Sequence, residues 1–428
     1  MPTASRLFFM VQMMNEQHDI HGKGAFKLKL AIVASYMILV PWFVIWLIGT
    51  HNFEPHIIAL ISGIAIVGAA FLMAWAAEAG QFVFSQAFAL AILALLQVAP
   101  EYSFEAVLAW QRRIHLAAAT MTGANRLLMG LGWPLIVFIA YISSKIRGDS
   151  DPVTEVELDV SQSVEIGFLV WCTIYSFIIV AKGTLDVIDV AVLVSTYVFY
   201  LIFCIKMPAE EVSEMEEIHG PAKLLLGLKG YLKAVGIFIF FLAGGLVIIT
   251  AAEPFINSII AVAIMAGISA FFFAQWVAPL LSEFPESTSA FYYATSKKLA
   301  PMGIGNLVSS KVNQWSLLIG TVPLVYSLSV GHLAFIPLTP LQREEILLTG
   351  AQSLFGVVAL MKLRFTIKDG LLLFGLWLIQ FVYPPIRIEI TVAYIILALI
   401  EFIYYRHENV KLFKEFARAW RLAFGKKK

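Results

Sequence analysis

Charged residues and cysteines are scarce in this chain of 428 residues. Asp, Glu, Lys and Arg make up 14% of it, whereas soluble domains contain about 25%. The composition therefore excludes an ordinary soluble protein. The two cysteines, Cys172 and Cys204, both lie in apolar runs, which excludes a disulfide framework. The 30 Lys and Arg residues nearly balance the 29 Asp and Glu residues, so no basic excess points to a nucleic-acid partner.

Motifs for enzymatic chemistry are also missing. The eight histidines form no HExxH motif, and no Ser/His or paired-Asp arrangement is present. The pair Gly303 and Gly305 lacks the third glycine and the preceding strand of a dinucleotide-binding site. No phosphate-binding loop for ATP is present either. We therefore expect a protein that is not an enzyme, needs no cofactor and uses no ATP.

Long hydrophobic runs, in contrast, are abundant. Hydrophobic residues make up 60% of the chain, and the mean hydropathy is +0.83. A helix that spans a bilayer needs about 20 mainly apolar residues. Twelve runs have this character, which predicts an all-α polytopic membrane protein with twelve transmembrane helices. They cover residues 30–49, 56–79, 83–110, 115–144, 164–181, 185–205, 231–254, 266–295, 303–329, 344–361, 369–384 and 388–405.

The basic residues predict the orientation of these helices. With both termini in the cytoplasm, 23 Lys and Arg residues fall on the cytoplasmic side and five on the other side. This asymmetry is the one that cytoplasmic loops carry in membrane proteins. We therefore expect cytoplasmic termini in a plasma membrane or a bacterial inner membrane, with membrane lipid as a partner.

Three pairs of similar segments indicate an internal duplication. Residues 95–110 resemble 279–294, residues 117–136 resemble 303–324, and residues 184–203 resemble 366–383, each pair about 180 to 185 residues apart. An odd number of spans separates the copies, so the two copies enter the membrane from opposite sides. We expect two inverted-topology five-helix repeats with one extra helix at each end, an architecture that places a site near the bilayer midplane.

This duplication predicts the boundaries along the chain. An N-terminal arm and extra helix occupy residues 1–55, the first repeat 56–206, a cytoplasmic linker 207–230, the second repeat 231–384, and an extra helix with a basic cytoplasmic tail 385–428. Asp189 and Asp369 occupy matched positions, where we expect them at helix starts because a carboxylate stabilises a helix N-terminus.

The repeats carry matched Pro-Glu pairs, which are the candidate functional residues. Pro100 and Pro285 remove a backbone donor in mid-span, so both are expected to break their helices. Glu101 and Glu286 follow directly, and Glu283 lies one turn before Glu286 on the same face. Carboxylates are rare inside membranes and are usually functional there. Oxygen-rich sites of this kind suit hard cations such as Ca²⁺ and Na⁺.

Two basic residues offer a purely structural alternative. Arg126 and Lys311 lie within predicted spans, so the acids could simply pair with them to hold helices together. The cost of buried charge and the doubled arrangement favour a functional site.

The pattern resembles the cation/calcium exchanger superfamily, which includes sodium/calcium exchangers. Its repeats carry roughly Gly-Thr-Ser-x-Pro-Glu, followed by Gly-Asn-x-x-Gly-Ser-Asn. The second repeat here has Ser282-Glu283-Phe284-Pro285-Glu286 and then Gly305-Asn306-Leu307-Val308-Ser309-Ser310. The first has Gln97-Val98-Ala99-Pro100-Glu101 and then Thr122-Gly123-Ala124-Asn125. The resemblance covers residues 56–384.

This resemblance implies a secondary cation antiporter that works by alternating access, with inorganic cations as substrates. Glu101 and Glu286 would be the metal ligands at its centre. The flanking cation-binding residues would be Gln97, Ser282, Glu283, Thr122, Ser310, Asn125, Asn313 and Gln314, with Arg126 an alternative to Asn125.

Lys311 and Arg126 depart from the family pattern and leave the coupling ion open. Lys311 stands where the family usually has Asn, and both residues would compensate part of the charge of the site. A lysine ammonium about 4 Å from a bound monovalent ion repels it by roughly 4 kcal/mol. Either a cationic side chain replaces one Na⁺, or protons replace sodium coupling. A degenerate ion-binding sensor without transport is the remaining alternative.

The tail at 406–428 alternates basic residues with Leu, Phe and Trp. This pattern is typical of a helix on an anionic membrane surface, and equally of a solvated tail after the last span.

Overall fold

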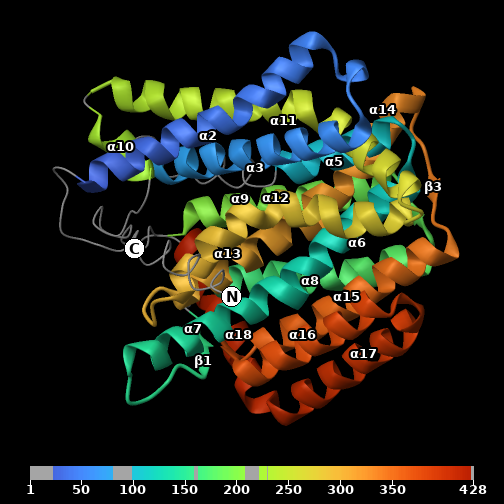
Figure 1. The fold of residues 1–428 in the computed structure, drawn as a ribbon. Helices are drawn as coiled ribbons and strands as arrows, with labels where there is room; N and C mark the ends of the chain where they lie inside the picture. The colour runs from blue at the N-terminus through green and yellow to red at the C-terminus, as the bar shows by residue number, and fades with distance from the viewer. Residues whose placement is uncertain (1–22, 81–98, 159–161, 208–220, 229, 426–428) are drawn as a thin grey trace. The chain divides into compact units, whose positions relative to one another are not determined.

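The computed structural model describes residues 23–80, 99–158, 162–207, 221–228 and 230–425 (Figure 1). These residues form helices, together with four short strands. They divide into two compact units, one with residues 1–99 and 209–255 and the other with residues 100–208 and 256–428.

The first unit consists of helices that pack along one another. It contains α2 (Lys23–Ile48), η1 (Thr50–Asn52), α3 (Pro55–Gly80), α10 (Pro221–Gly227) and the part of α11 (Leu232–Met265) up to Phe255. The indole N–H of Trp42 donates a hydrogen bond of 3.0 Å to the hydroxyl of Thr250. The helix α10, which contacts α2 and α3, lies in the predicted linker.

The second unit holds the remaining helices, and α15, α16 and α17 lie together in it (Figure 1). Its elements are α5 (Ala99–Trp110), α6 (Ile114–Leu127), η2 (Leu128–Gly132), α7 (Trp133–Arg147), α8 (Gln162–Lys182), α9 (Val187–Lys206), α12 (Ala270–Ala294), α13 (Ala300–Asn313), η4 (Gln314–Leu318), α14 (Ile319–Val330), α15 (Pro340–Leu360), α16 (Ile367–Val382), η5 (Pro384–Ile386), α17 (Arg387–Tyr404) and α18 (Arg406–Phe424).

Two small antiparallel sheets join the halves of the sequence. The strand β1 (Glu155–Glu157) pairs with β4 (Arg364–Thr366), and β2 (Thr184–Leu185) pairs with β3 (Ile336–Pro337). Each sheet therefore combines a connection from the first predicted repeat with one from the second. The order of helices and strands is also the same in both halves.

Matched capping boxes begin α9 and α16. The Asp186 side chain caps α9 with Asp189 as its partner, and the Thr366 side chain caps α16 with Asp369 as its partner. Each box satisfies backbone N–H groups that a helix start leaves unpaired. The expected helix-start roles of Asp189 and Asp369 are thus confirmed.

Most of the predicted apolar runs coincide with helices to within a few residues, and the run 83–110 is described from residue 99 on. The exceptions are α2, which begins at Lys23 instead of residue 30, and α11, which continues through Pro254 to Met265 instead of ending at residue 254. Among the described residues, five helices are long and apolar enough to cross a membrane by length and composition. These are residues 55–76, 114–147, 162–182, 187–206 and 232–265.

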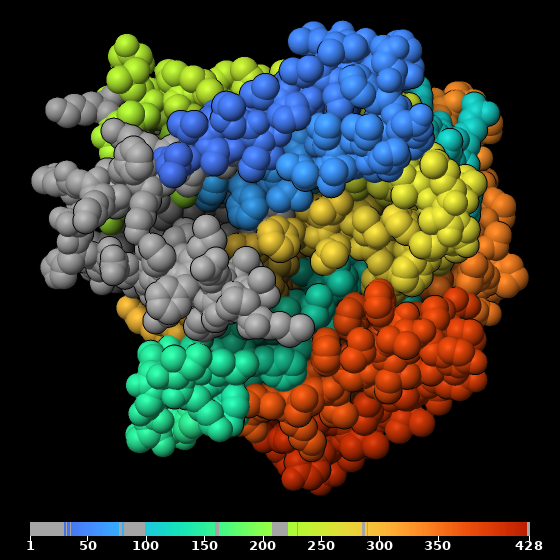
Figure 2. All heavy atoms as spheres, viewed as in Figure 1, coloured from blue at the N-terminus to red at the C-terminus, as the bar shows by residue number. Residues whose placement is uncertain are grey.

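The core of the second unit is rich in aromatic rings. Trp276 of α12 packs against Trp377 of α16 with ring centroids 5.9 Å apart, and Leu127 completes this cluster. The helix α16 also packs against α7 and η2, so the C-terminal helices form a continuous surface with α7 (Figure 2).

Two π-helical segments occupy matched positions in the halves. Residues 128–132 form η2 after α6, and residues 314–318 form η4 after α13. Such widened turns are rare and frequently occur at functional sites. Both follow directly on the segments in which the sequence predicts cation ligands.

Candidate functional site

Glu101 is buried on α5 and forms no ion pair with any residue that the structure describes. Its side chain is 4% exposed, and neither carboxylate oxygen has a hydrogen-bond partner among the described residues. The Ser282 hydroxyl of α12 interacts with this carboxylate and donates a hydrogen bond of 3.1 Å to the backbone carbonyl of Pro279 in its own helix. Pro100 lies on α5, and the turn before it falls outside the described residues, so the expected helix break at Pro100 stays a prediction.

A second carboxylate on α5, Glu105, was not predicted from the sequence. It is 1% exposed and accepts a hydrogen bond of 2.5 Å from the Thr120 hydroxyl on α6. Glu105 lies one turn after Glu101, so both carboxylates lie on one face of the helix. The spacing of four residues between the two acids is the signal in the sequence that points to Glu105.

The helix α12 brings Ser282 and Glu283 to the same region. Glu283 is 3% exposed and accepts a hydrogen bond of 3.0 Å from the Gln314 amide at the start of η4. The oxygen of that amide group, Oε1 of Gln314, is buried and has no hydrogen-bond partner among the described residues. Two predicted site residues from different helices are therefore in direct contact.

Lys311 and Asn125 meet where α13 approaches α6. The Lys311 Nζ atom donates a hydrogen bond of 3.2 Å to the backbone carbonyl of Asn125 and lies over the Trp315 ring, and both side chains are fully buried. Lys311 also interacts electrostatically with Glu283. The side-chain oxygen of Asn125 has no hydrogen-bond partner in the described part of the chain.

The remaining predicted polar residues are buried nearby on α6 and α13. Thr122 donates to the carbonyl of Ala118 within its own helix at 2.7 Å. Asn313 accepts a hydrogen bond from the hydroxyl of Tyr102, which is the residue after Glu101. Ser310 is 5% exposed on α13.

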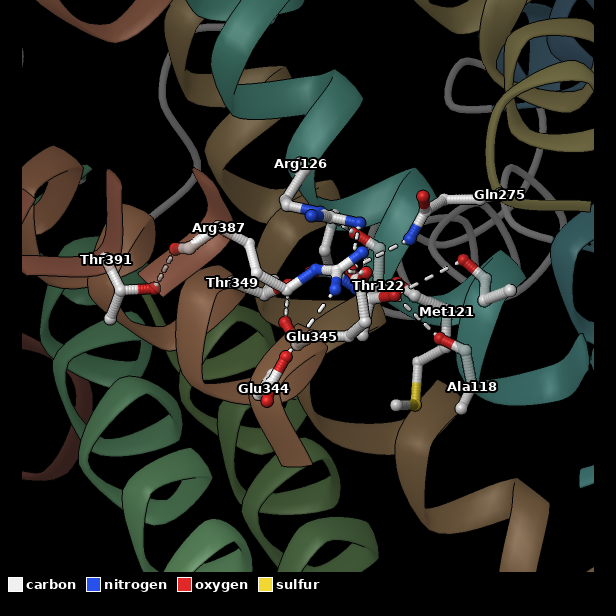
Figure 3. A network of polar contacts seen from close by, with 12 residues as sticks. Ala118, Met121, Thr122, Arg126, Gln275, Glu344, Glu345, Thr349, Arg387 and Thr391 are labelled. Carbon is white, nitrogen blue, oxygen red and sulfur yellow. Dashed lines mark hydrogen bonds and ion pairs between the residues drawn. The ribbon is translucent and has the colours of Figure 1, made fainter. Parts of the chain in front are cut away.

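Arg126 pairs with an acid that the sequence did not place in the site. Its Nη2 atom lies 2.5 Å from an Oε2 atom of Glu345 on α15, and both side chains are 1% exposed (Figure 3). Gln275 donates to the same oxygen at 2.9 Å, and Arg387 lies 3.2 Å from the other oxygen. The Arg126 guanidinium is therefore bound to Glu345, an acid outside the predicted site, and its compensation of the site charge stays a prediction.

Three predicted residues lie wholly or partly outside the described residues. Gln97 is outside them, and so are the side chains of Pro285 and Glu286. The backbone of α12 is described through position 285 and stays helical from Ala270 to Ala294. The expected break at Pro285 is therefore absent, since a proline removes only its own donor and its neighbours can keep helical geometry.

Close packing holds α6 against α12. A Cβ atom on Gly123 would lie 1.8 Å from the backbone oxygen of Gln275. Only a glycine permits such an approach, as in other close helix contacts in membranes. Gly123 belongs to the Thr-Gly-x-Asn segment that the sequence singled out.

The site offers oxygen atoms rather than nitrogen or sulfur ligands. Five buried oxygens of this site lack hydrogen-bond partners among the described residues, two on Glu101 and one each on Glu105, Asn125 and Gln314. Carboxylate and amide oxygens are the donors that hard cations prefer. Among the described residues, no group of three or more His, Cys, Asp or Glu side chains could hold a metal.

Residues 55–206 and 236–384 match the family model described as sodium/calcium exchanger protein. The chain belongs to the sodium/calcium exchanger family. It is thus a multi-pass membrane cation exchanger, an antiporter rather than an enzyme, and the resemblance seen in the sequence is confirmed.

Solved structures agree with this family. The H⁺/Ca²⁺ exchanger CAX is 38% identical, with a TM-score of 0.85 over 92% of this chain and 98% of that one. YfkE shares the fold, with 14% identity and a TM-score of 0.58 over 85% of this chain and 100% of that one. The sodium-calcium exchanger NCX_Mj also shares it, with 16% identity and a TM-score of 0.52 over 76% of this chain and 98% of that one. No curated protein sequence matches the chain.

Proposed function

We propose that this exchanger couples Ca²⁺ transport to protons, and that Glu101 holds a proton and the cation in turn. The observation that carries the proposal is the burial of the Glu101 carboxylate without a hydrogen-bond donor among the described residues. A buried carboxylate is costly as a free anion. A proton or a cation can remove that cost, and alternation between the two is an exchange reaction.

The proposed ligand set extends from Glu101 to its inverted counterpart. Glu286 would supply the second carboxylate, and Asn125 and Gln314 would supply the amide oxygens that now lack partners. The remaining ligands would be Gln97, Ser282, Glu283, Thr122, Ser310 and Asn313. This set is rich in oxygen and contains two or three carboxylates, as Ca²⁺ requires.

Lys311 favours protons over sodium as the coupling ion. Its ammonium group is fully buried and reaches the Asn125 backbone between α6 and α13. A Na⁺ ion about 4 Å from a charged Nζ atom would be repelled by roughly 4 kcal/mol, whereas a proton binds covalently to the Glu101 carboxylate and needs no coordination site beside that atom. The 38% identity to the H⁺/Ca²⁺ exchanger CAX supports the same choice.

The proposed architecture has two inverted five-helix repeats at residues 56–206 and 231–384. Extra helices would lie in residues 1–55 and 385–428, giving twelve spans with a cytoplasmic linker at 207–230 and both termini in the cytoplasm. The cross-paired strands β1–β4 and β2–β3 support the duplication, because each sheet is the counterpart of the other. Inverted repeats of this kind alternate access around a midplane site.

Flux in proteoliposomes tests the coupling ion. We expect an outward proton gradient to drive Ca²⁺ uptake, and an equal Na⁺ gradient at constant pH to drive none. Glu101→Gln should reduce uptake at least a hundredfold, whereas Glu389→Gln, an exposed carboxylate on α17, should leave it unchanged. Uptake driven by sodium alone would overturn proton coupling, and Ca²⁺ binding without any flux would favour a sensor.

A further inference from the structure

The last helix, α18, is held against the second unit by one of its faces. Asn409, Leu412 and Ala419 are at most 3% exposed along this face, and α18 contacts α8 and α9. Phe416 packs 5.6 Å from the Phe203 ring, and a Cβ atom on Gly167 would lie 2.6 Å from the Phe416 ring. The helix is therefore part of the folded unit rather than a solvated tail.

A second face of α18 is apolar but exposed. Val410, Phe413 and Trp420 are 45%, 60% and 44% exposed, and their spacing of three and seven residues puts them in one row. Trp420 packs against Phe199 of α9, which is itself 40% exposed. The apolar row therefore continues the apolar exterior of α9, which is long and hydrophobic enough to cross a bilayer.

A third face of α18 is basic. Lys411, Lys414, Arg418 and Arg421 are exposed, and at about 100° per residue they form a row beside the apolar one and away from the buried face. The acids Glu408 and Glu415 fall on the remaining side, where Glu408 pairs with Arg364 at 2.7 Å and Glu415 with Arg418 at 3.6 Å.

This order of faces fits one environment. A helix in the plane of a bilayer surface turns an apolar face to the acyl chains and a basic face to the lipid phosphates. Here the protein body occupies the third side, and the acids lie along the edge of the basic row, where Glu415 pairs with Arg418. We propose that α18 is a binding surface for anionic phospholipids, whose acyl chains meet the apolar row and whose headgroups meet the basic row.

A cavity marks where a headgroup fits. Lys411 and Lys414 line a cavity of about 250 Å³ together with Arg364 and His407. Its acidic lining residues are Glu157 and Glu408, and Glu408 is the partner of Arg364. The two lysines therefore supply the positive charge for a phosphate group, and the neighbouring apolar row selects a phosphate that carries acyl chains.

Lipid binding to the full-length protein tests this surface without using transport. In neutral detergent micelles, we would titrate the protein with fluorescent phosphatidylglycerol and with phosphatidylcholine of the same acyl chains. The variant Lys411→Gln/Lys414→Gln/Arg421→Gln should bind phosphatidylglycerol about a hundredfold more weakly, given the usual contribution of a basic residue near an anionic membrane. A control with the same charge change, Lys145→Gln/Lys297→Gln/Lys368→Gln, should lose less than threefold.

Three outcomes would overturn the proposal. Equal affinity of wild type and the α18 variant for phosphatidylglycerol would show that the basic row does not bind the headgroup. Equal affinity for phosphatidylcholine would leave only an apolar contact. Competition by millimolar inorganic phosphate would identify a site for soluble anions. Phe413→Ser provides a second check, since loss of the exposed ring should weaken lipid binding while the basic row stays intact.

Discussion

The buried pair of Arg126 and Glu345 allows a prediction with a defined size. Glu345 accepts contacts from Arg126 at 2.5 Å, from Gln275 at 2.9 Å and from Arg387 at 3.2 Å, so it links α15 to α6, α12 and α17 (Figure 3). Glu345→Gln preserves the size of the side chain and removes its charge. Arg126 would then be a buried cation without an anion.

The cost follows from the burial of both partners. Breaking a buried ion pair by removing one charge typically costs 3–5 kcal/mol. In a chain of this length, that corresponds to a fall of about 3–6 °C in the unfolding midpoint. The double variant Arg126→Gln/Glu345→Gln buries neither charge, so its loss should be smaller than the sum of the two single losses by at least about 2 kcal/mol.

Thermal unfolding of the purified protein in detergent measures these differences. Glu344→Gln is the matched control, because Glu344 is 39% exposed and lies 3.5 Å from Arg387. Exposed pairs contribute about 0–1 kcal/mol, so its midpoint should change little. A midpoint for Glu345→Gln within 2 °C of wild type, or strict additivity in the double variant, would refute the role assigned to this pair.

Two further predictions concern packing and pH. Gly123→Ala should disrupt the contact of α6 with α12 and lower the free energy of unfolding by about 1–3 kcal/mol. Gly375→Ala should leave it unchanged, because a Cβ atom on Gly375 would meet no other atom within 4 Å. Equal unfolding midpoints for the two variants would contradict the close approach of Gly123 to Gln275. Burial lowers the pKa of Lys362, but Asp369 and Glu401 outweigh it and raise that pKa above its ordinary 10.5. The ion pairs of Lys362 therefore stabilise the folded protein fully below about pH 10, and this stabilisation is lost as pH rises through the raised pKa of Lys362. The midpoints of wild type and Lys362→Met should differ at pH 7–9 and converge above pH 11, and a constant difference would count against the ion pairs.

The positions of the helices were largely readable from the sequence. An apolar run of spanning length has one stable arrangement, because backbone groups in lipid must be satisfied within the helix. Asp189 and Asp369 were predictable for a similar reason, since capping depends on residues three positions apart. The end of α11 was not predictable in this way, because a proline such as Pro254 can either end a helix or lie within it.

The contacts of the site were less readable. Arg126 was assigned to the site acids because it lies near them in the sequence pattern, but its partner Glu345 is more than 200 residues away. No local signal reports such a pairing, which depends on how α6 and α15 pack. The π-helical segments likewise have no residue signature, and Glu105 becomes a candidate once its burial and its contact with Thr120 are known.

The most direct test of the central claim is the release of protons when Ca²⁺ binds. In weakly buffered solution near neutral pH, adding saturating Ca²⁺ to the detergent-solubilised protein should acidify the medium. Glu101→Gln should release about one proton fewer per protein than wild type, and Glu389→Gln should match wild type. Equal proton release from Glu101→Gln and wild type, or binding of Ca²⁺ without any proton release, would contradict the exchange of proton and cation at Glu101.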